Sequence, residues 1–138
     1  TDPAMQSFED VRTHFAAQQT LANNEPYLIS FELDTGDGRR QGIYLAELES
    51  EDGNKLLRVS TPVAPLGAMD PAKCLRFNWA QRVGYLALND LDRVPYLHLC
   101  ENRPYAQLSA RELDRVISEI GALADSLEQA MNRGKDHL

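Results

Sequence analysis

An amphipathic stripe near the C-terminus constrains the fold more than any other feature of the sequence. Ser109 followed by Glu112 forms a capping box, the pattern that begins a helix. Apolar residues then recur at three- and four-residue steps, at Leu113, Val116, Ile117, Ile120, Leu123, Ala124, Leu127 and Met131. This spacing predicts a helix of about six turns with one apolar face. Gly121 interrupts it, which either weakens the helix or permits a close approach.

Two shorter helices precede this one. The first begins at the cap Ser7, and we expect Asn23-Asn24 and Pro26 to end it. The second begins at the cap Asp70 with Pro71 in its first turn, where the missing N–H costs nothing. We expect it to run through Val83 and to stop at Gly84.

Alternating apolar residues predict five strands between the helices. They cover residues 27–33, 43–48, 56–63, 85–88 and 96–100, and turn residues occupy 34–38, 51–54 and 89–93. The short connections indicate antiparallel pairing. The predicted class is therefore α+β, with the order α-βββ-α-ββ-α and an antiparallel sheet packed against helices. We expect one domain over residues 5–132, an expression-vector remnant at 1–4 and a frayed tail at 133–138.

Charge excludes several classes of partner. The chain has 138 residues and a net charge of −7, and its first 70 residues hold 12 acids and 5 bases. A negative surface repels phosphate backbones and anionic membranes, so we expect no nucleic-acid or membrane partner. No apolar run approaches the ~20 residues of a membrane span, and no signal-peptide core is visible. Cys74 and Cys100 have apolar neighbours, which predicts buried free thiols in a reducing cytoplasm.

No pattern in the sequence builds a catalytic, metal or cofactor site. The histidines His14, His98 and His137 lack metal-site spacing, and the glycines do not match a phosphate loop. The paired acids fall in turns, where water keeps a carboxyl group at its ordinary acidity. We therefore expect no enzyme and no cofactor. The open alternative is a small-ligand binder or an unrecognised enzyme with a pocket near His98 and Cys100, which would require a closed pocket where His98, Cys100 or Asp90 converge.

The second helix carries apolar residues on more than one side. Leu75, Trp79 and Arg82 share one stripe, whereas Phe77 points elsewhere. One side can meet the sheet, and the other can meet a second subunit or a partner, since Trp and Arg are frequent in binding hot spots. The open alternative is that Phe77 and Trp79 both pack into one core.

Three segments of the C-terminal half resemble a known family. They are Cys74–Trp79, an apolar helix that carries an Asn; Gly84–Leu88, the next strand; and Ala122–Glu128, with an Ala-Asp-x-Leu-Glu pattern. Together with the element order, they resemble the type III secretion chaperone-like fold, which includes secretion chaperones and YbjN-like regulators. The turn at 89–93 lacks the glycine often found there.

The resemblance implies a non-enzymatic homodimer that binds an extended segment of a client protein. In secretion chaperones the second helix and the neighbouring strand commonly form the dimer contact, which would place Trp79, Val83 and Leu86 near it. The residues expected to bind a second copy or a client are Leu75, Trp79, Arg82, Val83 and Leu86.

Overall fold

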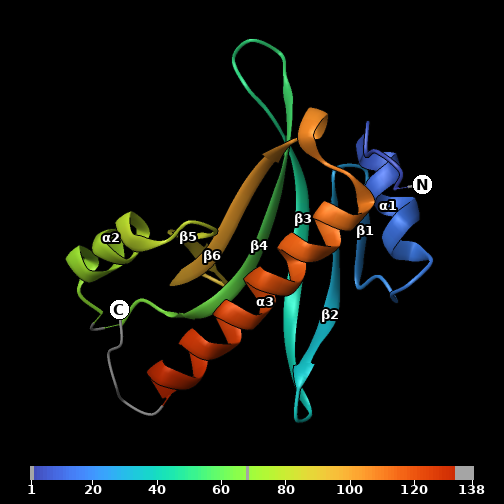
Figure 1. The fold of residues 1–138 in the computed structure, drawn as a ribbon. Coiled ribbons are helices and arrows are strands. Elements are labelled where there is room, and N and C mark those ends of the chain that lie inside the picture. The colour runs from blue at the N-terminus through green and yellow to red at the C-terminus, as the bar shows by residue number, and fades with distance from the viewer. Residues whose placement is uncertain (1, 68, 133–138) are drawn as a thin grey trace.

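The computed structural model describes residues 2–67 and 69–132 (Figure 1). In chain order the elements are α1 (Phe8–Ala16), β1 (Asn23–Glu25), β2 (Leu28–Gly36), β3 (Arg39–Glu49), β4 (Lys55–Pro65), α2 (Pro71–Ala80), β5 (Tyr85–Leu91), β6 (Val94–Pro104), a short 3₁₀ turn (Tyr105–Gln107) and α3 (Ala110–Asn132).

The strands form one antiparallel sheet of six strands in the order β1-β2-β3-β4-β6-β5. The predicted α+β class with an antiparallel sheet is confirmed. β1 was not predicted; it forms one edge of the sheet, and β5 forms the opposite edge. Its residues bond to β2 because the Asn23 backbone N–H and side-chain Nδ2 both donate to Ser30 Oγ, at 3.1 and 2.7 Å.

The helices cover one face of the sheet (Figure 1). Alternate strand residues such as Ile43, Leu45, Leu57, Val59 and Leu99 are buried on that face. The ring of Phe15 on α1 stacks on Phe31 of β2, with centroids 5.0 Å apart. Buried residues of all three helices join the inward strand residues in a single apolar cluster. The opposite face, which carries Tyr44, Arg58, His98 and Cys100, has no helix on it within the described residues.

Two helices end earlier than the sequence predicts. α1 has the predicted cap, with Ser7 Oγ accepting from the Asp10 N–H at 3.2 Å, but it ends at Ala16. The asparagines expected to stop it belong to β1 instead. α2 has the predicted cap at Asp70 but ends at Ala80, because Gln81 has extended backbone angles. The segment from Gln81 to Gly84 is therefore a connection to β5.

Two of the hairpin turns are tighter than predicted because the strands beside them are longer. β2 and β3 are joined by Asp37-Gly38, and β5 and β6 by Asp92-Arg93. Asp92 and Arg93 both have positive φ, at 50° and 69°. A two-residue turn with two such angles matches the right-handed twist of the strands that it joins. This hairpin forms without the glycine that such a turn normally favours.

α3 begins at the predicted capping box, where Ser109 Oγ accepts from the Glu112 N–H at 3.1 Å. A Cβ atom on Gly121 would lie 2.6 Å from Leu33 Cδ2, so this glycine permits the close approach of α3 to β2. Asp2 and Pro3 also contact the helix start. The Asp2 carboxylate accepts from the Arg111 N–H at 2.9 Å, and the Pro3 carbonyl from the Ala110 N–H at 2.8 Å. The predicted tail at 133–138 lies outside the described residues.

Candidate functional site

Helix α2 stands apart from the other helices, beside the edge strand β5 (Figure 1). Its start is fixed by Asp70, whose side chain accepts from the Ala72 N–H at 3.0 Å. Pro71 follows in the first turn, where its ring presets a helical backbone angle. Residues next to each other in the sequence therefore fix where this helix begins.

The side chain of Asn78 ties α2 to the sheet through two hydrogen bonds. Asn78 Oδ1 accepts from the Leu86 N–H at 2.7 Å, and Asn78 Nδ2 donates to the Leu86 carbonyl at 3.1 Å. Leu86 lies on the edge strand, so these backbone groups have no neighbouring strand to bond with. The amide of Asn78 takes the place of a missing strand at this one residue.

The sides of α2 have opposite environments. Cys74 is buried and Phe77 packs against the core, so this side faces the molecule. Leu75 and Trp79 lie one turn apart on the other side, 69% and 93% exposed. The alternative in which both aromatic residues of α2 enter one core is therefore wrong. An indole this exposed contributes almost nothing to the packing of an isolated chain.

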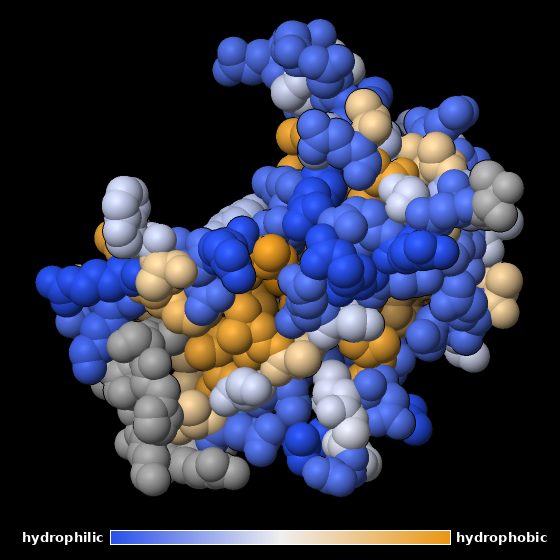
Figure 2. Space-filling model, viewed as in Figure 1, coloured by the Kyte–Doolittle hydropathy of each residue, from blue (hydrophilic) through white to orange (hydrophobic). Residues whose placement is uncertain are grey.

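The other three predicted site residues are distributed around the end of α2. Arg82 is exposed, and Val83 is partly buried against the core. Both line a hollow of about 440 Å³ between the end of α2 and α3 that Leu123 borders on the helix side. Figure 2 shows apolar surface gathered between α2 and α3. The side chain of Leu86 is buried at 7% exposure, so Leu86 meets α2 through its backbone.

Leu88 is a further exposed apolar residue that was not among the predicted site residues. It lies on β5 and is 55% exposed. It pairs with Leu97 and follows Leu86 on the same face of the sheet, beyond the reach of the Asn78 bonds. The predicted alternation of strand 85–88 could have placed it on the apolar face. Leu88 is exposed because β5 is an edge strand, and the position of a strand within a sheet cannot be predicted from the residues of that strand alone.

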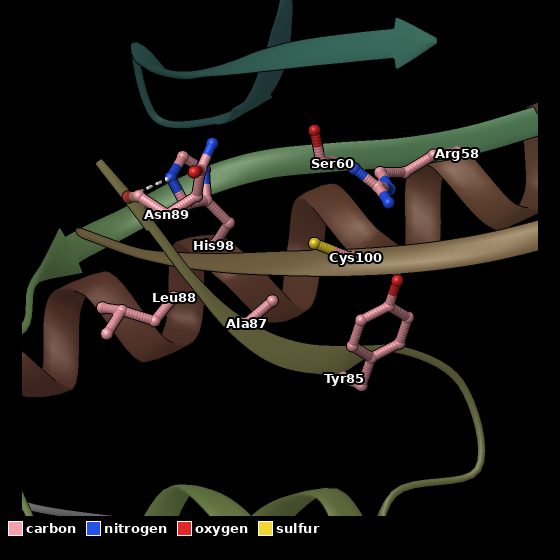
Figure 3. Close-up of a pocket in the computed structure, with 8 residues that line it drawn as sticks. All are labelled: Arg58, Ser60, Tyr85, Ala87, Leu88, Asn89, His98 and Cys100. Atoms are coloured by element: carbon pink, nitrogen blue, oxygen red, sulfur yellow. Dashed lines mark hydrogen bonds between the residues drawn. The ribbon is translucent and has the colours of Figure 1, made fainter. Parts of the chain in front are cut away.

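A second hollow, of about 390 Å³, lies on the helix-free face of the sheet (Figure 3). The residues that line it come from β4, β5 and β6 and include His98, Cys100, Arg58 and Tyr85. His98 is half-buried and points away from the buried Leu97 and Leu99, as the sequence predicts. Its Nε2 lies 3.1 Å from the Asn89 carbonyl. A pocket near His98 and Cys100, the premise of the alternative function, is therefore present.

This hollow does not assemble a thiol nucleophile. Cys74 and Cys100 are both buried free cysteines, as predicted. Burial raises the pKa of the Cys100 thiol, although the guanidinium of Arg58 lowers it in part, so Cys100 stays protonated at neutral pH. Asp90 is exposed and does not line the hollow. His98 and Cys100 therefore share the hollow, and Asp90 does not join them.

No group of three or more His, Cys, Asp or Glu side chains lies close enough to hold a metal ion in the described part of the chain. Among residues 2–67 and 69–132, no helix is both long and apolar enough to cross a membrane.

Solved structures with the same arrangement of elements identify the fold. A chain of the HopA1–SchA chaperone–effector complex superposes with a TM-score of 0.58 at 15% identity, over 88% of this chain and 90% of that one. A chain of the complex between the Yersinia pestis type III secretion chaperone SycH and a YscM2 fragment gives 0.58 at 19% identity, over 86% and 94%. The chain has the type III secretion chaperone-like fold.

The same chaperone-like fold occurs in YbjN, a candidate transcription regulator from E. coli. YbjN superposes with a TM-score of 0.54 at 14% identity, over 94% of each chain. No protein-family model and no curated protein matches the sequence. The suspected resemblance to secretion chaperones and YbjN is confirmed at the level of the fold. A fold alone does not determine a function.

Proposed function

We propose that this chain is a non-enzymatic, cytoplasmic protein-binding module that forms a homodimer and binds an extended segment of a client protein. The observation that carries the proposal is the exposure of Trp79, at 93%, beside Leu75 on a helix held to the body through β5. Large aromatic side chains supply much of the energy of binding interfaces when they become buried. A second copy or a client would cover this side of α2.

The chaperone-like fold supports a role in protein binding. Two of the solved structures that share it are complexes of chaperones with protein partners. The surface of α2 provides the apolar anchors Leu75 and Trp79, and the exposed Arg82 follows them at its end. This combination of a central apolar pair and a charged rim is common in protein interfaces. The net charge of −7 keeps such a surface in solution.

The dimer is tested by size-exclusion chromatography with light scattering at micromolar concentration. A dimeric mass is expected, and a clean monomer would contradict the homodimer. A photo-crosslinking residue placed at position 79 should then link two copies, since Trp79 is expected at the contact. The same residue placed at Glu51, exposed in the β3–β4 turn, is the matched control and should give no linked dimer.

The client is tested by crosslinking in the native host followed by mass spectrometry. A secretion chaperone and a YbjN-like regulator would differ in the protein recovered and in the neighbouring genes. An adjacent effector gene in a secretion operon favours the chaperone. Recovery of the same partner with Trp79→Ala as with the unchanged chain would count against α2 as the client site.

The hollow at His98 and Cys100 favours a second candidate, small-ligand binding. It has a volume within the range of ligand pockets, about 300–1,000 Å³. The exposed position of Asp90 and the protonated Cys100 argue for binding there without catalysis. Binding of this kind can occur together with the protein-binding role, because the hollow lies on the face of the sheet opposite α3 (Figure 3).

A further inference from the structure

Arg58 is a half-buried cation that has no anionic partner among residues 2–67 and 69–132. Three other arginines of the described chain are half-buried, and each pairs with a carboxylate: Arg12 with Glu9, Arg39 with Asp125, and Arg103 with Glu101 and Glu112. Arg58 has no such ion pair among the described residues. Its Nε is buried and has no hydrogen-bond partner. A buried donor of this kind is costly, so its presence calls for an explanation.

The guanidinium of Arg58 lies in the hollow on the helix-free face. Figure 3 shows it directed over the sheet toward Ser60 and Cys100, with the Tyr85 hydroxyl pointing to the same place. Arg58 lies between Leu57 and Val59, both buried on the helix-covered face, so strand alternation directs it to the other face. The register aligns Ser60 with Cys100, and Cys100 with Tyr85, across three strands.

The remaining walls of the hollow carry hydrogen-bonding groups but no carboxylate. They include the Ser60 and Tyr85 hydroxyls, the Asn89 amide and the His98 imidazole, while Ala87 provides an apolar part. The chain as a whole has seven more acids than bases, so a hollow with a cation and no acid is distinctive. Its chemistry complements an anion with an apolar body.

We propose that this hollow binds a small organic acid, whose carboxylate is held by the guanidinium of Arg58. The planar fork of an arginine matches the two oxygens of a carboxylate, and the buried Nε–H would then be satisfied. The side chain of Ala87 would contact the carbon skeleton of the acid. One cation balances one carboxylate, whereas inorganic phosphate carries more charge than Arg58 alone can neutralise. The site is independent of Trp79 and of the proposed protein binding.

Nuclear magnetic resonance of the ¹⁵N-labelled chain tests this site, with acetate, butyrate and benzoate as probes. At millimolar concentrations, at least one acid is expected to shift the Arg58 Nε–Hε resonance and the backbone amides of Ser60 and Ala87. Benzamide, the neutral analogue of benzoate, should leave them in place. Inorganic phosphate is the further control, and phosphate shifts equal to those of the acids would overturn the assignment to a carboxylate.

Matched variants assign the effect to the hollow. Arg58→Gln is expected to weaken binding of the acid by about tenfold or more, the loss of one charge-assisted hydrogen bond. Arg40→Gln removes an exposed cation from β3 outside the hollow and should change nothing. Ala87→Leu keeps Arg58 and fills the hollow, so it should also weaken binding of the acid. If Arg58→Gln fails to fold, Ala87→Leu still tests whether the acid binds in this hollow.

Three results would overturn the proposal. The first is the absence of any Arg58 shift with all three acids. The second is an equal response to benzoate and benzamide, which would mean that the carboxylate is not recognised. The third is unchanged affinity in folded Arg58→Gln or in Ala87→Leu. Trp79→Ala should bind the acid normally, so failure of the protein-binding proposal and failure of this one are distinguishable.

Discussion

The side-chain amide of Asn78 forms hydrogen bonds with both backbone polar groups of Leu86, at 2.7 and 3.1 Å. Through this pair a helix blocks one position on the edge of the sheet and at the same time fixes its own orientation. Together with the packing of Cys74 and Phe77, this pair holds one side of α2 to the molecule while Leu75 and Trp79 stay exposed on the other.

The first prediction concerns Asn78→Leu, which keeps the size of the side chain and removes both hydrogen bonds. It leaves the Leu86 amide and carbonyl unpaired, so we expect a loss of about 1–3 kcal/mol in the free energy of unfolding. Amide hydrogen exchange at Leu86 should accelerate, while the buried Leu99 serves as the internal control. Unchanged protection of Leu86 would show that α2 does not depend on this pair.

The second prediction concerns Trp79→Ala. Because the indole is 93% exposed, the change in unfolding free energy should stay within about 0.5 kcal/mol. Self-association, measured by light scattering across a dilution series, should weaken clearly. A fall in stability of about 3–5 kcal/mol would instead be the signature of a lost core residue. Tyr27→Ala, which truncates another exposed aromatic residue, is the control.

The third prediction concerns Gly84→Ala at the start of β5. Gly84 has a φ of +92°, and an added Cβ would lie 3.0 Å from Ile120 Cδ1 and 3.3 Å from Leu99 Cδ1. Backbone strain and crowding of the core should together cost about 2 kcal/mol or more in denaturant unfolding. Gly53→Ala is the matched control, with a φ of +85° and no atom within 4 Å. Equal losses in the two variants would exclude a contribution from packing.

The fourth prediction concerns pH. Burial and the nearby Glu47 carboxylate raise the pKa of Tyr105 well above its ordinary value, and its hydroxyl donates to Glu47 Oε1 at 3.1 Å. The folded state therefore keeps this proton after the unfolded state has released its own. The stabilisation is fully present below about pH 10 and is lost as the pH rises further.

Tyr105→Phe tests this dependence. Denaturant unfolding across the alkaline range should show a steeper loss of stability in the unchanged chain than in Tyr105→Phe. Tyr27→Phe alters an exposed tyrosine and should retain the steep loss. Parallel curves for all three proteins would show that Tyr105 does not retain its proton in the folded state.

Local patterns predicted the elements that depend on neighbouring residues. The capping box at Ser109 and the apolar stripe after it gave α3, and strand alternation gave the correct face for His98. The same logic separated Phe77 from Trp79 on α2. These features follow from helical and strand periodicity, which a single sequence contains in full.

Features that depend on tertiary pairing were not predictable in this way. The strand β1 forms because Asn23 bonds to Ser30. Taken alone, the residues of β1 predict only the end of the preceding helix. The exposure of Leu88 follows from the edge position of β5. Alternation directs Arg58 to the helix-free face, but only the assembled sheet shows that no acid faces it there.

The placement of all helices on one side of the sheet has a consequence for how this chain can change during evolution. In β4 and β6, side chains point alternately to the two faces of the sheet. One set of alternate residues fills the core, and the other set includes the residues that line the hollow. Replacements in the first set must conserve volume, whereas those in the second can alter polarity freely without disturbing the interior. Divergent copies could therefore exchange one bound molecule for another by substituting every second position of two strands, while the scaffold and the surface of α2 stay as they are.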